Sequence, residues 1–128
     1  MNSRIKTIRG ILEQLYSELG SAHACLVAKE DLEGVIMFPD TFKSRASPIW
    51  SPLSCVLQSM LVMVAENMEC PFDRLYVELF DFSIIFLVLP NTDTALITIC
   101  DKNSFKKLDD LVGLMEGARD RIMSVEFQ

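Results

Sequence analysis

The segment that most constrains the fold is an almost uncharged stretch near the middle of the chain, SPLSCVLQSMLVMVAENMEC at residues 51–70. Ser51 and Pro52 are typical of a helix start, because serine caps the first turn and proline lacks only an N–H that this turn leaves unpaired. Residues 53–65 contain only three polar side chains (Ser54, Gln58 and Ser59). A surface helix of a small domain normally carries a full polar face. We therefore expect a helix that ends near Cys70–Pro71 and is apolar on nearly all sides.

The residues before this helix predict one helix, two strands and a loop. Residues 3–19 place apolar side chains at helical spacing, and Gly20 is a common helix terminus. Residues 24–28 and 35–38 are short apolar runs on either side of the polar EDLEG, which predicts a hairpin. The next segment, DTFKSRASPIW, has no clear period, and we expect an exposed loop there.

The residues after the helix predict three strands and a terminal helix. DRLYVELF alternates like a half-exposed strand, and FSIIFLVLP is apolar on both faces like an interior strand. NTDT has turn chemistry, and ALITIC completes an antiparallel meander. A final helix is expected to begin at Asn103 or Ser104. Its apolar residues recur at helical spacing: Leu108, Leu111, Met115, Ala118, Ile122 and Val125.

These elements predict an α/β (α+β) fold of order α-β-β-α-β-β-β-α. We expect one domain, residues 1–128, with a single five-stranded, mostly antiparallel sheet. The first and last helices are amphipathic and would share one face of the sheet, and the apolar helix would lie alone on the other.

The composition excludes several classes of protein. A net charge of −6, from 12 basic and 18 acidic residues, disfavours nucleic-acid binding. The sequence has neither a signal-peptide pattern nor an apolar run long enough to span a membrane. Four cysteines (Cys25, Cys55, Cys70 and Cys100) form no C-x-x-C pair. We expect four reduced, buried thiols and a cytoplasmic location.

The outer side of the apolar helix is expected to be covered by another chain. About five exposed apolar side chains, at roughly 1.5–3 kcal/mol each, are worth on the order of 10 kcal/mol. That value is comparable to the whole stability of a small domain, about 5–15 kcal/mol. The alternative is that the helix lies entirely within the core of its own chain.

A free strand edge supports the same expectation. The strand at residues 74–80 begins the meander, and unpaired edges invite pairing. A two-fold dimer that joins helix to helix and edge strand to edge strand would cover both surfaces. The predicted interface residues come from both elements: Leu53, Leu57, Met60, Leu61, Val64, Met68, Arg74, Tyr76 and Glu78.

Three features together carry a resemblance to a known family. They are the order of elements, the apolar second helix opened by Ser-Pro, and the run LYVELFDFSIIFLVLPNTDTALITICD followed by a terminal amphipathic helix. The chain resembles the roadblock family, which contains the dynein light chains and the bacterial and archaeal regulators of Ras-like small GTPases. The resemblance implies homodimers or heterodimers with antiparallel second helices and joined third strands. It also implies a non-catalytic module that binds or regulates a Ras-like small GTPase. One departure is the turn at residues 80–82, which lacks the glycine of a tight hairpin and predicts a longer turn or a bulge.

Few residues suggest catalysis. The single histidine, His23, lies two residues from Cys25 and would share a strand face with it, but no third orienting group or oxyanion donor set is visible. The sequence shows no metal-ligand spacing and no phosphate-binding glycine loop, so we expect no enzyme activity, no metal and no cofactor. Arg45, with Lys43 beside it, is the candidate GTPase contact in the irregular loop, and a solvated loop charge is the alternative. We expect binding to a GTPase switch region rather than an arginine finger.

Two other functions stay open. An assembly or scaffold subunit could pair with a related chain without touching a GTPase. A small-ligand sensory domain of PAS- or profilin-like shape would require a cavity lined by polar groups, and the apolar strands offer few of these.

Overall fold

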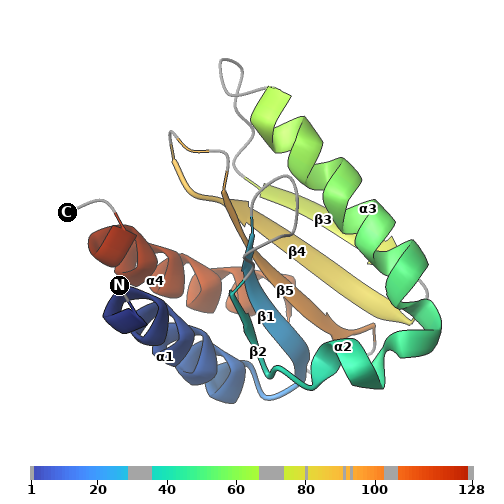
Figure 1. Cartoon of the computed structure of the whole chain (residues 1–128), viewed down its shortest axis with the longest axis horizontal. Coiled ribbons are helices and arrows are strands. Elements are labelled where there is room, and N and C mark those ends of the chain that lie inside the picture. Colours follow the sequence, from blue (N-terminus) through green and yellow to red (C-terminus); the bar gives the residue numbers. More distant parts are fainter. Residues whose placement is uncertain are drawn as a thin grey trace.

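A computed structural model describes residues 2–28, 36–66, 74–79, 81–90, 92, 94–102 and 107–126 of the chain. Apart from the four-residue helix α2, the order of elements confirms the predicted α-β-β-α-β-β-β-α arrangement, an α+β fold (Figure 1). The elements are α1 (Asn2–Leu19), β1 (Ala22–Ala28), β2 (Ile36–Phe38), α2 (Phe42–Arg45), α3 (Ser47–Glu66), β3 (Arg74–Leu79), β4 (Phe82–Val88), β5 (Ala95–Asp101) and α4 (Leu108–Glu126).

The strands form one sheet in the order β2-β1-β5-β4-β3, and every neighbouring pair is antiparallel. The predicted meander of the last three strands is therefore confirmed, with β3 at the edge of the sheet. The β3–β4 register runs without a shift to the pair Leu79–Phe82, so neither a bulge in these strands nor a longer loop separates them. Phe80 lies outside the described residues.

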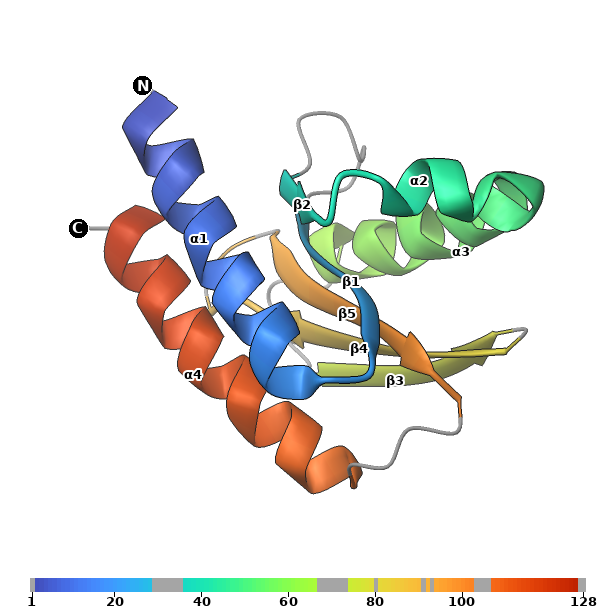
Figure 2. The ribbon, with the colours of Figure 1, turned by 90° about the horizontal axis from the view of Figure 1, so that it is seen from below.

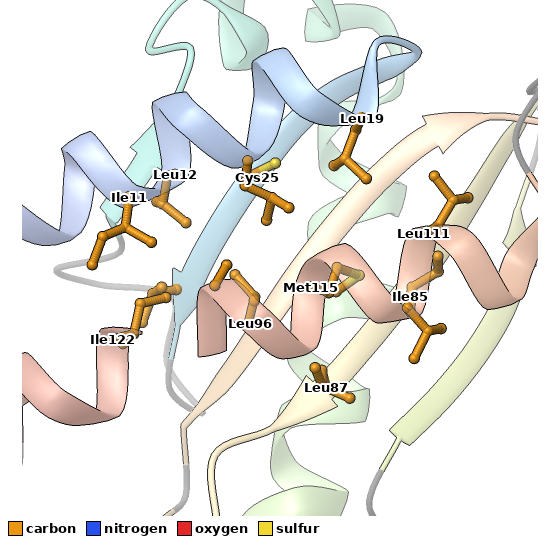
Figure 3. Packing of buried hydrophobic residues seen from close by; sticks show 14 of the residues in the cluster. Ile11, Leu12, Leu19, Cys25, Ile85, Leu87, Leu96, Leu111, Met115 and Ile122 are labelled. Atoms are coloured by element: carbon orange, nitrogen blue, oxygen red, sulfur yellow. The ribbon is translucent and has the colours of Figure 1, made fainter. Parts of the chain in front are cut away.

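Helices cover both faces of the sheet, as the sequence predicted. α1 and α4 pack together on one face, whereas α3 lies on the other (Figure 2). The α1/α4 core contains Leu15. It also contains Leu12, Ile85, Leu87, Met115 and Ile122, which are labelled in Figure 3. The α3 core contains Leu53, Leu57, Leu61, Ile84, Phe86 and Ile97. β4 contributes alternate residues to both cores, which explains why its sequence is apolar on both faces.

The segment predicted as an exposed loop is instead helical. It forms α2 and the first turn of α3, which begins at Ser47 rather than near Ser51. Phe42 and Ala46 are buried in the α3 core, so two apolar side chains hold this segment against the sheet. Pro48 lies in the first turn of α3, where its missing N–H leaves no helical bond unmade. The expected end of this helix near Cys70–Pro71 lies outside the described residues.

The outer helices match their predicted periodicity along most of their length. α1 ends at Gly20, whose φ of +75° suits glycine and whose N–H donates to the Tyr16 carbonyl at 3.3 Å. In α4, Leu111, Met115, Ala118 and Ile122 are buried, but Leu108 is 43% exposed because it lies in the first turn, before the helix reaches the core. The predicted cap residues Asn103 and Ser104 lie outside the described residues.

The cysteines differ in their environment. Cys25 and Cys100 are buried in the α1/α4 core, where burial raises the pKa of Cys25 to about 12 and that of Cys100 to about 11. Cys55 is exposed on α3, so the expectation of four buried thiols is wrong for this residue. All three are free thiols, and Cys70 lies outside the described residues.

Candidate protein-interaction surface

The inner side of α3 packs on the sheet. Leu53, Leu57 and Leu61 recur every four residues and therefore lie on one face of the helix, and each is 0% exposed. The prediction that these three leucines face a partner is wrong. They fill the α3 core against Ile84 and Phe86, on the face of the sheet opposite α1 and α4.

The outer side of α3 carries no charge over most of its length. Residues 47–65 contain no Asp, Glu, Lys, Arg or His, although the helix lies at the surface. Cys55, Ser59 and Glu66 are exposed and Val62 is half-exposed, and these positions step along the side opposite the leucines. Met63 is 44% exposed. A surface helix without charged side chains is unusual in a small domain and is typical of a helix that contacts another chain.

Of the other predicted interface residues on this helix, Met60 is the one whose side chain the structure describes. Met60 and Val56 are half-buried, and Met60 packs against the α3 core at its margin. The Val64 side chain and all of Met68 lie outside what the structure describes. Sequence reasoning missed Val62, which a helical phase anchored on Leu53 would have placed on the opposite side. It also missed Val56 and Met63, which the same phase places at the margin of the leucine side.

Two of the serine hydroxyl groups on α3 donate to backbone carbonyls of the same helix. Ser54 Oγ donates to the Ser51 carbonyl at 3.0 Å, and Ser59 Oγ donates to the Cys55 carbonyl at 2.9 Å. Such back-bonding means that the serines lose little hydrogen bonding to water when another surface covers them. The outer side of α3 can therefore be buried without an unpaired donor at these positions.

The β3 strand shows the predicted alternation. Leu75 and Val77 are half-buried against the α3 core, whereas Arg74, Tyr76 and Glu78 are exposed on the opposite face. These three residues share this face with Ile85 and Leu87 of the paired strand β4. Ile85 and Leu87 belong to the α1/α4 core, whereas β3 lies beyond the part of the sheet that α4 covers. Among the described residues, no other strand pairs with the outer edge of β3.

A small polar network holds the exposed side chains of β3. The Tyr76 hydroxyl donates to Glu78 Oε1 at 3.2 Å and shares a second hydrogen bond with the Ser83 hydroxyl at 3.2 Å. Lys102 Nζ lies 3.5 Å from Glu78 Oε2. Tyr76 nevertheless remains 47% exposed, so this network orders the side chain without covering it.

The candidate GTPase contacts lie on α2. Arg45 is exposed, and its Nη2 donates to the His23 carbonyl at 3.3 Å. The side chain of Lys43 lies outside what the structure describes. Whether either residue contacts a GTPase stays a prediction.

His23 and Cys25 do not share a strand face, contrary to the expectation from their spacing. The β1–β5 register shifts between Ala22 and Ala24, which turns the His23 ring toward Phe82, with ring centres 5.2 Å apart. Phe82 packs against the α3 core, whereas Cys25 belongs to the α1/α4 core. The arrangement cannot bring the imidazole to the thiol as a general base would require.

The described part of the chain shows neither a metal-binding cluster nor a helix that could cross a membrane. Among those residues, no group of three or more His, Cys, Asp or Glu side chains could hold a metal ion. None of the described helices is both long and apolar enough to cross a membrane.

Comparisons with known proteins place this fold. No protein-family model and no curated protein matches the sequence. The structure is similar to MglB of Myxococcus xanthus, with a TM-score of 0.71 and 12% identity over 94% of this chain and 88% of that chain. It is also similar to a Roadblock/LC7 domain from Streptomyces avermitilis, with a TM-score of 0.60 and 11% identity over 93% of this chain and 97% of that chain. The chain has the roadblock fold.

A third similar structure extends this finding. MglC of Myxococcus xanthus has a TM-score of 0.68 and 15% identity over 92% of this chain and 98% of that chain. At such low identities the likeness shows the fold alone and carries no residue-level role. The roles of α3 and β3 therefore rest on the exposed surfaces of this chain.

Proposed function

We propose that this chain is a non-catalytic, dimeric protein-interaction module that binds or regulates a Ras-like small GTPase. The observation that carries the proposal is the uncharged outer side of α3 beside β3, the strand at the edge of the described sheet, on a roadblock fold. The cytoplasm is the proposed location, and the free thiols of the buried Cys25 and Cys100 support it.

The dimer would use the outer side of α3 together with the β3 edge. Met60 and Met63 have flexible side chains that adapt to a facing surface, and Val56 and Val62 add apolar area. Because only half-exposed or partly exposed side chains remain, their burial is worth on the order of 5 kcal/mol, half of the value expected from the sequence. A two-fold arrangement lets one patch cover its own copy and pairs the free strand edges at the same time.

The GTPase partner is proposed from the resemblance to the roadblock family and from the basic residues of α2. Lys43 and Arg45 would stand near a bound GTPase and attract its acidic surface. The chain would act by binding one nucleotide-dependent conformation of a switch region and shifting its population.

The proposal is tested with tagged protein as bait in native lysate, run in parallel with GDP and with a non-hydrolysable GTP analogue. We expect a small GTPase to be retained in one nucleotide state only, as read by mass spectrometry. The test variant is Arg45→Ala, which changes an exposed side chain on α2. The matched control is Arg121→Ala on α4, where the arginine hydrogen-bonds Gln14 far from α2. A related chain or large complex without any GTPase in either lane would refute the GTPase proposal and favour a scaffold.

A further inference from the structure

Alternate residues of β3 direct their backbone N–H and C=O groups toward the outer edge of the sheet. Immediately before and after β4, the Asp81 carbonyl accepts from the Lys102 N–H at 2.9 Å, and the Leu89 N–H donates to the Thr94 carbonyl at 3.0 Å. The odd-numbered residues of β4 thus bond toward β5, and its even-numbered residues bond toward β3. Even-numbered β4 residues pair with Leu75, Val77 and Leu79. The N–H and C=O groups that β3 directs to its free edge are therefore those of Arg74, Tyr76 and Glu78.

The outward backbone groups of Arg74, Tyr76 and Glu78 restrict how two copies of β3 can pair. In an antiparallel, two-fold pairing, hydrogen-bonded pairs form only between residues whose backbone groups point outward. An axis at Leu75 pairs Arg74 with Tyr76 and leaves Glu78 beyond the partner strand, and an axis at Val77 pairs Tyr76 with Glu78 and leaves Arg74 out. Only an axis at Tyr76 pairs all three residues, which gives about six backbone hydrogen bonds rather than about four.

The charges select the same register. An axis at Arg74 or at Glu78 would place like charges directly opposite each other, which is unfavourable. With the axis at Tyr76, Arg74 of each copy lies opposite Glu78 of the other. Leu75 then lies opposite Val77 of the other copy on the α3 side of the sheet, so the apolar face also continues across the strand junction. One register thus satisfies hydrogen bonds, charges and apolar contacts together.

We propose that two identical copies of this chain join their β3 strands antiparallel in the register centred on Tyr76, with two symmetric Arg74–Glu78 pairs. This inference rests on the dimer of the proposed function and adds the identity of the partner and the alignment of the strands. The strand RLYVE is complementary to itself in this one register, so an identical chain fits the edge.

The test exchanges the charges. In Arg74→Glu, both cross-strand pairs become carboxylate against carboxylate, and in Glu78→Arg both become cation against cation. Each variant alone should dimerise about ten- to a hundredfold more weakly than the wild type, since two exposed pairs change from attractive to repulsive. An equimolar mixture of the two variants restores both opposite-charge pairs, and the mixed dimer should reach within about threefold of the wild-type affinity.

The measurement is sedimentation equilibrium, with one variant carrying a longer tag so that the mixed dimer has its own mass. Lys6→Glu, on the exposed surface of α1, makes the same change in net charge as Arg74→Glu but away from β3. Lys102→Ala tests whether the intrachain pair with Glu78 matters. Both controls should dimerise like the wild type. The double variant Arg74→Glu/Glu78→Arg, which carries both exchanges in one chain, should dimerise with itself.

The outcomes separate this inference from the dimer itself. A wild-type dimer whose charge variants neither weaken nor recover in the mixture would refute the register and leave the dimer standing. A wild-type chain that stays monomeric at all concentrations would overturn both. Wild-type chains that remain monomeric alone but dimerise with a purified related chain would refute the identical partner.

Discussion

Replacing Leu57 with alanine should destabilise each single chain, whereas replacing Met63 with alanine should weaken only its association. Leu57 is 0% exposed and lies between Leu53 and Leu61, which are also 0% exposed. These neighbours hold α3 at its distance from the sheet, so the cavity left by the substitution cannot collapse fully. We expect a loss of about 3–4 kcal/mol, within the usual range for a buried leucine. Met63 is 44% exposed, and its truncation should cost a single chain at most about 0.5 kcal/mol.

Urea unfolding followed by circular dichroism measures both effects. With a slope near 2 kcal/mol per molar urea, the Leu57→Ala midpoint should fall by about 1.5–2 M. The titration is repeated at several protein concentrations, because dimerisation adds a concentration-dependent term to the free energy of unfolding. The Met63→Ala midpoint should match the wild type at the lowest concentration and fall below it at the highest. Equal midpoints for Leu57→Ala and wild type in the monomeric range would refute the assignment of this side of α3 to the core.

Three further predictions concern β3 and the cysteines. Tyr76→Pro removes an N–H that points to the free edge and should leave a folded monomer that no longer dimerises. Val77→Pro removes a backbone hydrogen bond to β4 and should unfold the chain. Equal loss of folding in both variants would contradict the assigned edge. The contribution of the two buried thiols to the free energy of unfolding should be constant below pH 9. Above pH 9 it should fall by about 1.4 kcal/mol per pH unit for each thiol until the native pKa is reached, because unfolding lowers the pKa values of Cys25 (about 12) and Cys100 (about 11) to near 9.0. A Cys25→Ala/Cys100→Ala variant should show a shallower decline in alkaline unfolding titrations. In the native protein a thiol-alkylating reagent should label Cys55 at least tenfold faster than either buried cysteine, as read by peptide mass spectrometry, and labelling should be slowed at concentrations that favour the dimer.

The sequence was sufficient for the architecture because each element carries its own period. Helical spacing in α1 and α4, alternation in β3 and the doubly apolar run of β4 each follow from which faces of an element are buried. The same local signals failed for residues 42–50. There Phe42 and Ala46 are buried by contact with α3 and the sheet, and two isolated apolar residues produce no period that a sequence can display.

The interface on α3 was harder to place, since a helix apolar on both sides gives no contrast from which to read its phase. Residues 53–65 include leucines, valines and methionines all around the helix. The side that packs on the sheet is decided by tertiary fit, and Leu53, Leu57 and Leu61 take it. The same ambiguity affected His23, because a register shift at one residue of β1 turned its ring to the opposite face from Cys25. Neither outcome depends on residues near in sequence.

The two parts of the proposed interface contribute differently to association. The outer side of α3 offers on the order of 5 kcal/mol of apolar burial, which is comparable to the lower estimates, about 4 kcal/mol, for the entropic cost of associating two chains. It has no charges between residues 47 and 65 to fix the orientation of a partner. The β3 edge offers directional backbone bonds and two exposed ion pairs worth about 0.2–1 kcal/mol each, which set the register but add little affinity. Neither surface alone would therefore hold a dimer, and a change confined to Arg74 or Glu78 should alter the alignment of the partners as strongly as their affinity.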